Sequence, residues 1–294
     1  MTPFIHTENP MKKKLIAVAF LGLAAFAHAG DWDEPQAPFA LYGNSYYVGP
    51  KGIAAVLVTS PAGHILIDAG TPKSPAGIAA SIRRLGFKIE DVKYILTSHE
   101  HADHVGGAAT LQELTGATVI GSARSTAVLA TGKPDAADPQ YASLPEMAPV
   151  VKTRAVRDGD VVTLGPLAIT AHATPGHTPG GLSWTWQSTE NGRTANMVYA
   201  DSLNAVGQQG FRYGGDPRWP EARAQLEASI AKIAGLQCDI LVAAHPEFSG
   251  LWERKAKQAQ LGNAAFIDPE ACRRYAEQGR QRLEKLLREE AAAR

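Results

Sequence analysis

The sequence predicts an α/β protein in which two β-sheets pack together and helices cover their outer faces. Three observations favour this class. Short apolar runs typical of strands alternate with segments of helical periodicity. This pattern occurs in both halves of the chain, and neither half contains an obvious linker. A length of 294 residues could accommodate two domains, but we expect residues 30–294 to form one.

In the first half, tight turns and glycines separate the apolar runs. Residues 60–63 form the turn of an expected hairpin, and Ile78, Ile82 and Leu85 have the spacing of one helix face. The expected elements are short strands over 39–70, a helix over 75–85, a buried strand over 92–97, a helix over 108–114, a strand over 118–120 and a helix over 122–130.

The second half begins with a stretch, 131–148, that is rich in Pro, Gly and Asp and has no period. We expect a long loop there, and such loops in compact domains are often functional. This loop and a second one, 207–215, can together frame a substrate cleft, although mobile surface loops fit equally well. The expected elements are strands over 152–156, 160–164, 167–173, 182–186, 197–201 and 238–244, a helix over 217–236 and a final helix capped at 268–269.

The amino terminus, residues 1–29, has the pattern of a secretory signal peptide. A basic region, an apolar stretch of 13 residues and a small-residue cleavage site follow one another at 12–14, 15–27 and 27–29. The apolar stretch is too short to span about 30 Å of hydrocarbon as a membrane anchor. Residues 1–10 form an upstream extension if translation starts at Met11. We therefore expect a periplasmic mature chain that is free of the membrane.

Composition excludes several classes of protein. With 45% apolar and 20% charged residues, the chain can bury a sizeable core. Its 29 basic and 29 acidic side chains argue against electrostatic capture of nucleic acid, and loss of the leader moves the formal charge only from 0 to −2. Two cysteines exclude a disulfide-dense scaffold, although export would allow them to form one bridge instead of remaining buried free thiols.

Histidine is the informative residue type. His99, His101, Asp103 and His104 place four metal ligands within six residues, directly after a buried strand. Imidazole and carboxylate groups are ligands that zinc prefers. His99 and His101 can converge on one ion, whereas Asp103 and His104 suit a second ion beside it. Protonated histidines this close would repel one another, so a crowded cluster without a metal is disfavoured.

Two further histidines lie at the ends of strands among residues that form turns. His177 lies in Thr-Pro-Gly-His-Thr-Pro-Gly and His245 in Ala-Ala-His-Pro, contexts that suit the rim of a cleft. By contrast, His64 lies beside a hairpin turn and His172 lies within a strand, so we expect both to be structural. Five of the seven histidines of the mature chain thus become candidate ligands.

These motifs resemble the metallo-β-lactamase superfamily. ILIDAG, SHEHADHVGG, TPGHTPG, YADSLN and AAHP occur in family order over nearly the whole mature chain. The chain is most similar to subclass B3, because Ser202 follows Tyr-Ala-Asp and no cysteine lies there. The seven-residue step from Cys238 to His245 and the presence of Cys272 in the last helix also fit, and this subclass typically joins those two cysteines by a disulfide.

The resemblance implies a four-layer αβ/βα sandwich with two Zn²⁺ ions at one edge of two mixed sheets. It assigns His99, His101 and His177 to the first zinc and Asp103, His104 and His245 to the second. A metal-bound hydroxide, oriented by Asp103, would then attack the carbonyl of a β-lactam antibiotic and so confer resistance. We expect a monomer that acts on these small molecules and needs no macromolecular partner.

Several assignments stay open at the level of sequence. Asp68 resembles a residue that braces the ligand loop, although a turn-capping aspartate fits equally well. Either Asp201 or Ser202 faces the metals, and we expect Ser202 to do so and to bind the substrate carboxylate together with Asn204. An exported zinc lactonase or thioesterase of the same superfamily is the main alternative function. A zinc-binding protein without catalytic activity is a further, weaker alternative.

Overall fold

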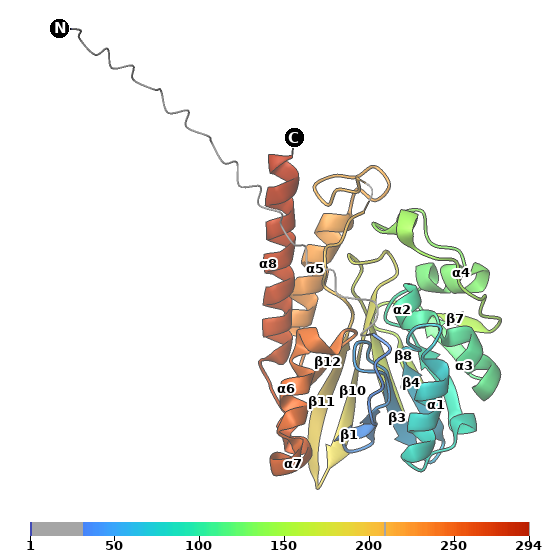
Figure 1. Ribbon diagram of the computed structural model, residues 1–294. Coiled ribbons are helices and arrows are strands. Elements are labelled where there is room, and N and C mark those ends of the chain that lie inside the picture. Colours follow the sequence, from blue (N-terminus) through green and yellow to red (C-terminus); the bar gives the residue numbers. More distant parts are fainter. Residues whose placement is uncertain (2–31, 209, 294) are drawn as a thin grey trace.

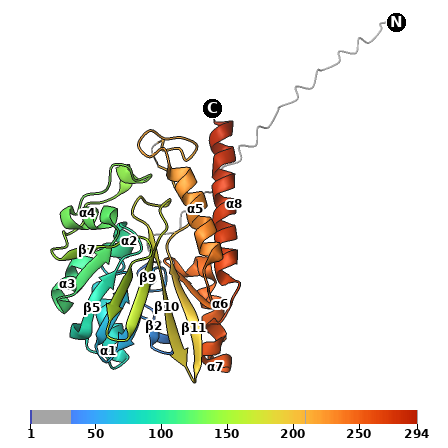
Figure 2. The same ribbon diagram turned by 180° about the vertical axis from the view of Figure 1, so that it is seen from behind.

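The computed structural model describes residues 1, 32–208 and 210–293. The expected signal peptide therefore lies outside the described residues, apart from Met1. The described chain forms two β-sheets that face each other, with helices on both outer sides (Figures 1 and 2). None of the described helices is both long enough and apolar enough to cross a membrane.

The first sheet has seven strands in the order of the sequence. Its first four strands are antiparallel neighbours, and its last four are parallel. The expected hairpin at 60–63 joins the third and fourth strands. The strands are β1 (Phe39–Tyr42), β2 (Ser45–Tyr47), β3 (Val56–Ser60), β4 (Gly63–Ile67), β5 (Val92–Leu96), β6 (Thr118–Gly121) and β7 (Thr153–Ala155).

The second sheet has five strands in the order β12-β11-β10-β9-β8. The pair β11 and β12 is parallel, and the other pairs are antiparallel, so both sheets are mixed. The strands are β8 (Val161–Leu164), β9 (Leu167–Ala173), β10 (Leu182–Glu190), β11 (Arg193–Ala200) and β12 (Ile240–Ala243).

Helices complete the outer layers. The first sheet is covered by α1 (Pro75–Arg84), α3 (Ala108–Thr115) and α4 (Ala123–Thr131), and the second by α5 (Ala222–Gly235) and α8 (Ala271–Ala292) (Figure 1). Shorter elements are α2 (Ala102–Val105), α6 (Leu251–Ala256), α7 (Gln258–Leu261) and the 3₁₀ turns Ile89–Asp91, Tyr141–Ser143, Pro246–Ser249 and Gly262–Phe266.

Apolar side chains fill three layers between these elements. One cluster lies between the sheets and includes Tyr47, Ile65 and Trp184. A second lies between the first sheet and its helices, and a third between the second sheet and α5 and α8. Burial of each large side chain contributes roughly 1.5–3 kcal/mol to folding. The predicted four-layer αβ/βα sandwich is confirmed.

Several boundaries differ from those expected, since β10 runs to Glu190 and β11 begins at Arg193, each several residues beyond the predicted strand. The helix predicted over 217–236 begins only at Ala222, because Pro220 has no N–H and disfavours helical backbone at the residue before it. The preceding segment instead forms turns in which Asp216 accepts hydrogen bonds from the backbone and side chain of Arg218. The final helix begins at Ala271, and the helices α2, α6 and α7 were not predicted.

The start of α8 is linked covalently to the second sheet. Cys238, which precedes β12, forms a disulfide with Cys272 in the first turn of α8. This bridge fixes the longest helix beside the strand whose end leads to His245. The ends of β4, β5, β11 and β12 together bring Asp68, the 98–104 segment, Asp201 and His245 to one edge of the sandwich.

Candidate metal centre

A strained aspartate organises the loop that carries most candidate ligands. Asp68 directly follows β4 and adopts a φ of 60°, a conformation that Asp tolerates better than most residues. Its carboxylate accepts hydrogen bonds from the backbone N–H of Ser98 at 2.6 Å, the Ser98 hydroxyl at 2.7 Å and the Tyr199 hydroxyl at 2.7 Å. These bonds fix the residue that precedes His99 and offset the backbone strain.

His99 is fully buried and has one nitrogen free for a ligand. Its Nδ1 lies 2.8 Å from Oδ1 of Asp201, which places the ring in a defined orientation. Its Nε2 is buried and has no hydrogen-bond partner. A buried polar atom without a partner is costly in a folded protein, and a metal ion would satisfy it. Asp201 therefore lies behind His99, on the side away from this free nitrogen.

His101 is oriented by a residue that the sequence did not reveal. Its Nε2 lies 3.0 Å from Oδ2 of Asp138, which is fully buried. The other carboxylate oxygen of Asp138 accepts the backbone N–H of Gln140 at 2.7 Å. Asp138 belongs to the predicted 131–148 loop, whose length indicated a function but not which side chain provides it. Nδ1 of His101 remains for a ligand.

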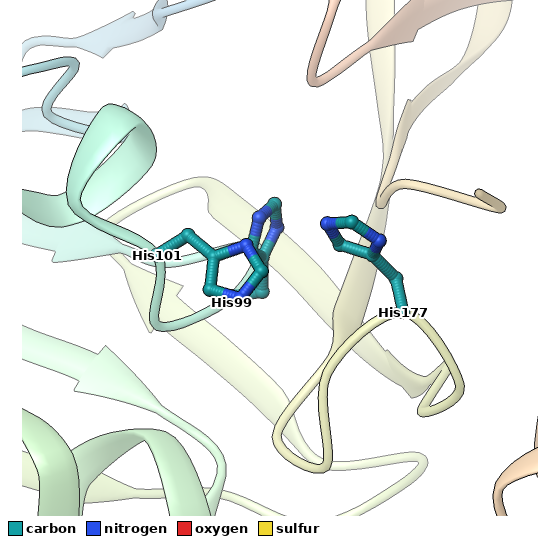
Figure 3. Close-up of side chains that lie close together, drawn as sticks. All are labelled: His99, His101 and His177. Carbon is teal, nitrogen blue, oxygen red and sulfur yellow. The ribbon is translucent and has the colours of Figure 1, made fainter. Parts of the chain in front are cut away.

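His177 approaches from the other half of the chain. It lies on the loop between β9 and β10, and its ring points toward those of His99 and His101 (Figure 3). The backbone carbonyl of Asn204 lies 2.8 Å from its Nδ1, so Nε2 is left for a ligand. Potential ligand atoms of the three histidines all lie within 4.8 Å of one another, as a shared metal ion requires.

The second group of expected ligands lies beside the first. Nε2 of His104 lies 3.0 Å from Oδ2 of Asp103 and 3.2 Å from Nε2 of His245. Nε2 of His245 lies 3.5 Å from the same Asp103 oxygen. Asp103 and His104 also lie within 4.8 Å of a ligand atom of His99, so the two groups form one continuous cluster.

The electrostatics of the cluster favour a cation. Burial, reinforced by His104, lowers the pKa of His99 well below its usual value. Burial likewise lowers the pKa of His177 to about 3 and that of His245 to about 4. Burial alone would lower the pKa of His104, but the Asp103 carboxylate outweighs it and raises this pKa to about 10. The neutral imidazoles of His99, His177 and His245 beside the Asp103 carboxylate are donors that a divalent metal prefers.

Glu100 lies within the motif but faces the loop of His177. Its buried carboxylate accepts the backbone N–H of Gly180 at 3.0 Å and the hydroxyl of Thr178 at 3.1 Å. A Cβ at Gly180 would lie 2.4 Å from Oε2 of Glu100, so a larger residue there would displace this carboxylate. Burial raises the pKa of Glu100 to about 7. Glu100 thus connects the two loops that supply the first group of histidines.

The other expected residues are placed as follows. Ser202 is buried and directly follows Asp201 in the turn after β11. Asn204 contacts His177 through its backbone, and its side-chain oxygen is buried without a partner. His64 packs against the Phe87 ring and His172 lies 2.8 Å from the Thr185 hydroxyl. In the described residues, neither histidine belongs to a group of metal-ligand side chains.

Aromatic rings flank His245 on two sides. The ring of Trp32 lies 5.7 Å from it and that of Phe248 lies 5.9 Å from it, centroid to centroid. Trp32 reaches this position although it is more than 200 residues away in the sequence. Such contacts restrict the rotation of the imidazole. No periodicity or motif in the sequence indicated this role for the amino-terminal tryptophan.

Comparison with known proteins agrees with the fold and the cluster. A family model of the metallo-β-lactamase superfamily matches residues 48–245, about two thirds of the chain. The chain therefore belongs to the metallo-β-lactamase superfamily.

Several solved structures indicate which part of the superfamily this chain resembles. MEM-A1, a subclass B3 metallo-β-lactamase isolated from a soil metagenome library, is 59% identical, covers 90% of this chain and 100% of its own, and superposes with a TM-score of 0.89. The Rm3 metallo-β-lactamase is 51% identical, with 89% and 97% coverage and a TM-score of 0.88. MIM-1 from Novosphingobium pentaromativorans is 40% identical, with 92% and 96% coverage and a TM-score of 0.84. The resemblance to subclass B3 is confirmed.

Hydroxyacylglutathione hydrolases are also similar to this chain, at lower sequence identity than these solved structures. The hydroxyacylglutathione hydrolase of Brucella ovis is 31% identical over 72% of this chain and 68% of its own length. That of Anaeromyxobacter dehalogenans is 32% identical over 52% of this chain, and the match spans only 46% of that relative.

Proposed function

We propose that this chain is an exported zinc hydrolase that opens the amide bond of β-lactam antibiotics. One observation carries the proposal. Six side chains of metal-ligand type converge at one edge of a sandwich that superposes on metallo-β-lactamases over nearly its whole length. The proposal assigns two Zn²⁺ ions to the cluster. His99, His101 and His177 would hold the first, and Asp103, His104 and His245 the second.

The residues around the candidate ligands orient the imidazole rings toward the metal site. When bound, paired zinc ions supply Lewis acidity, which makes water more acidic and polarises a carbonyl group. Asp201, Asp138 and the Asn204 carbonyl hold one nitrogen each of His99, His101 and His177, and so direct the other nitrogen toward the ion.

Asp103 is the candidate for orienting the attacking water. Its side chain is 14% exposed and that of neighbouring His245 is 13% exposed, whereas those of His99 and His104 are fully buried. Water and substrate therefore reach the cluster beside Asp103. Contact with His104 holds the pKa of the Asp103 carboxylate far below its usual value against the effect of burial, so Asp103 accepts hydrogen bonds and does not donate them.

Substrate contacts are assigned to the turn after β11 and to two loops. Ser202 and Asn204 would bind the carboxylate that β-lactams carry. The loops 131–148 and 207–215 would frame the cleft, and the backbone N–H of Gln208 donates a hydrogen bond to the Pro139 carbonyl at 2.9 Å, which joins them. Export to the periplasm and a monomeric state belong to the same proposal.

The test is a substrate profile of residues 30–294 with two equivalents of zinc. We expect hydrolysis of a penicillin, a cephalosporin or a carbapenem, followed by loss of absorbance, and expect a chelator to abolish it. A simple lactone and a glutathione thioester serve as comparison substrates, because a lactonase or thioesterase is the competing function. Rapid turnover of either one without consumption of any β-lactam would refute the proposal.

A further inference from the structure

The loop that presents His177 is held by a buried tyrosine from outside the ligand motifs. The hydroxyl of Tyr213 donates a hydrogen bond to the backbone carbonyl of Gly176 at 2.8 Å. Tyr213 is 1% exposed, so this bond is shielded from water. Burial also raises the pKa of Tyr213, and its hydroxyl therefore keeps the donated proton at any physiological pH.

The carbonyl that Tyr213 holds belongs to the peptide unit of His177. The oxygen of Gly176 and the nitrogen of His177 lie in one rigid plane, so a bond to that oxygen fixes the backbone from which the imidazole extends. The ring itself is fixed at Nδ1 by the Asn204 carbonyl. Backbone and ring constraints together determine the direction of Nε2, the atom left for a metal.

Tyr213 is in turn held by the last turns of α8. The carboxylate of Glu290 accepts the backbone N–H of Tyr213 at 2.8 Å and that of Gly214 at 2.8 Å. Both bonds are charge-assisted, and they fasten an exposed loop to a long helix. The end of the chain is thereby connected to His177 through two contacts, Glu290 to Tyr213 and Tyr213 to Gly176.

We propose that Tyr213 is a positioning residue for His177, and that Glu290 acts through Tyr213 to hold it in place. The inference rests on the proposed function, because it takes His177 as a metal ligand. Neighbouring contacts keep the loop folded without the hydroxyl, since Ser229 on α5 donates to the Pro175 carbonyl at 2.6 Å and Glu100 holds Gly180. Loss of the hydroxyl therefore allows the imidazole of His177 to change its orientation, while the fold is kept.

Zinc affinity is the readout that separates positioning from general stability. Metal-free protein is titrated with zinc in competition with a coloured chelator, and the His177→Ala variant identifies the binding step that depends on this ligand. We expect Tyr213→Phe to weaken that step by about 10-fold and to leave the other step unchanged, the size that loss of a ligand-orienting contact typically causes.

Matched variants control for the loss of a hydroxyl or of a charge. Tyr42→Phe removes a hydroxyl that donates to the Arg193 carbonyl at 3.2 Å, away from the cluster, and should keep native zinc affinity. Glu290→Ala should weaken the same step as Tyr213→Phe, whereas Glu289→Ala, which loses only an ion pair with Lys285, should not. Because Glu290 lies at the end of a helix, its variant tests the inference even if Tyr213→Phe folds poorly.

The outcomes distinguish this inference from the function on which it rests. Native affinity at both steps in Tyr213→Phe and Glu290→Ala would overturn the positioning role and leave the proposed function intact. An equal loss at both steps would also overturn it, because it would indicate a general structural role. A native protein that takes up no zinc would overturn both.

Discussion

At the scale of single residues, the orienting partners of the histidines are as informative as the histidines themselves. Asp138 is the clearest case. It is fully buried on the 131–148 loop, and it holds His101 through one oxygen and its own loop through the other. Removal of its carboxylate would leave Nε2 of His101 without a partner and release the ring.

We therefore expect Asp138→Ala to lower hydrolytic activity by about 10-fold or more and to weaken zinc binding at the step that involves His101. Glu146→Gln, an exposed change in the same loop, should have no effect on either quantity. Rates under saturating zinc and a zinc titration measure the two effects. Unchanged zinc affinity in Asp138→Ala would contradict the orienting role of this carboxylate.

The sequence indicated the candidate ligands but not the partner of His101, for a physical reason. His99, His101, Asp103 and His104 are close in sequence, so their common chemistry is visible as a motif. Asp138 contacts His101 across 37 residues, and only folding defines that contact. Asp201 was expected near the ligands, and the structure places its carboxylate against Nδ1 of His99; that Ser202 faces the metals stays a prediction.

At the scale of elements, the periodic segments were predicted well and the irregular ones were not. The helices α1, α3 and α4 and the strands of both sheets lie near the predicted positions, although β10 and β11 extend beyond theirs. The start of α5 was missed, because the predicted helix ran through Pro220, which the interior of a helix does not tolerate. The short α6 and α7 follow His245 in a segment with no strong pattern.

The disulfide at the start of α8 gives a prediction at this scale. It closes a loop between residues separated by 34 positions. In the chain-entropy description, this cross-link raises the free energy of the unfolded state by about 4 kcal/mol. We expect the double variant Cys238→Ala, Cys272→Ala to lose stability of this order. Chemical denaturation of the zinc-loaded proteins measures it, with reduced native protein as the comparison. Equal unfolding free energies in the native and double-variant proteins would contradict a stabilising role.

At the scale of the whole molecule, the cluster joins the two sheets. His99 and His104 come from the loop after β5 in the first sheet, whereas His177 and His245 follow β9 and β12 in the second. An ion held by residues of both sheets binds only the folded arrangement, so it shifts the unfolding equilibrium toward the native state.

Removal of the metal should therefore destabilise the entire fold. At zinc concentrations near 100 times the dissociation constant, we expect a stabilisation of about 2.7 kcal/mol and an increase in Tm of roughly 5–10 °C over chelated protein. Calorimetry with and without chelator measures this difference, and His177→Ala should show a smaller one. Identical transitions for the loaded and chelated native protein would argue against metal binding across the sheets.

The distance along the chain between the ligands has a consequence for how the protein acquires its metal. His104 and His245 lie 3.2 Å apart in space although 141 residues separate them in sequence. Each of the two proposed ligand sets needs a histidine from both halves of the chain, so neither set is complete until the slow long-range contacts have formed. If the chain folds only after the export that we propose, the zinc available in the periplasm would set how much of the protein becomes loaded.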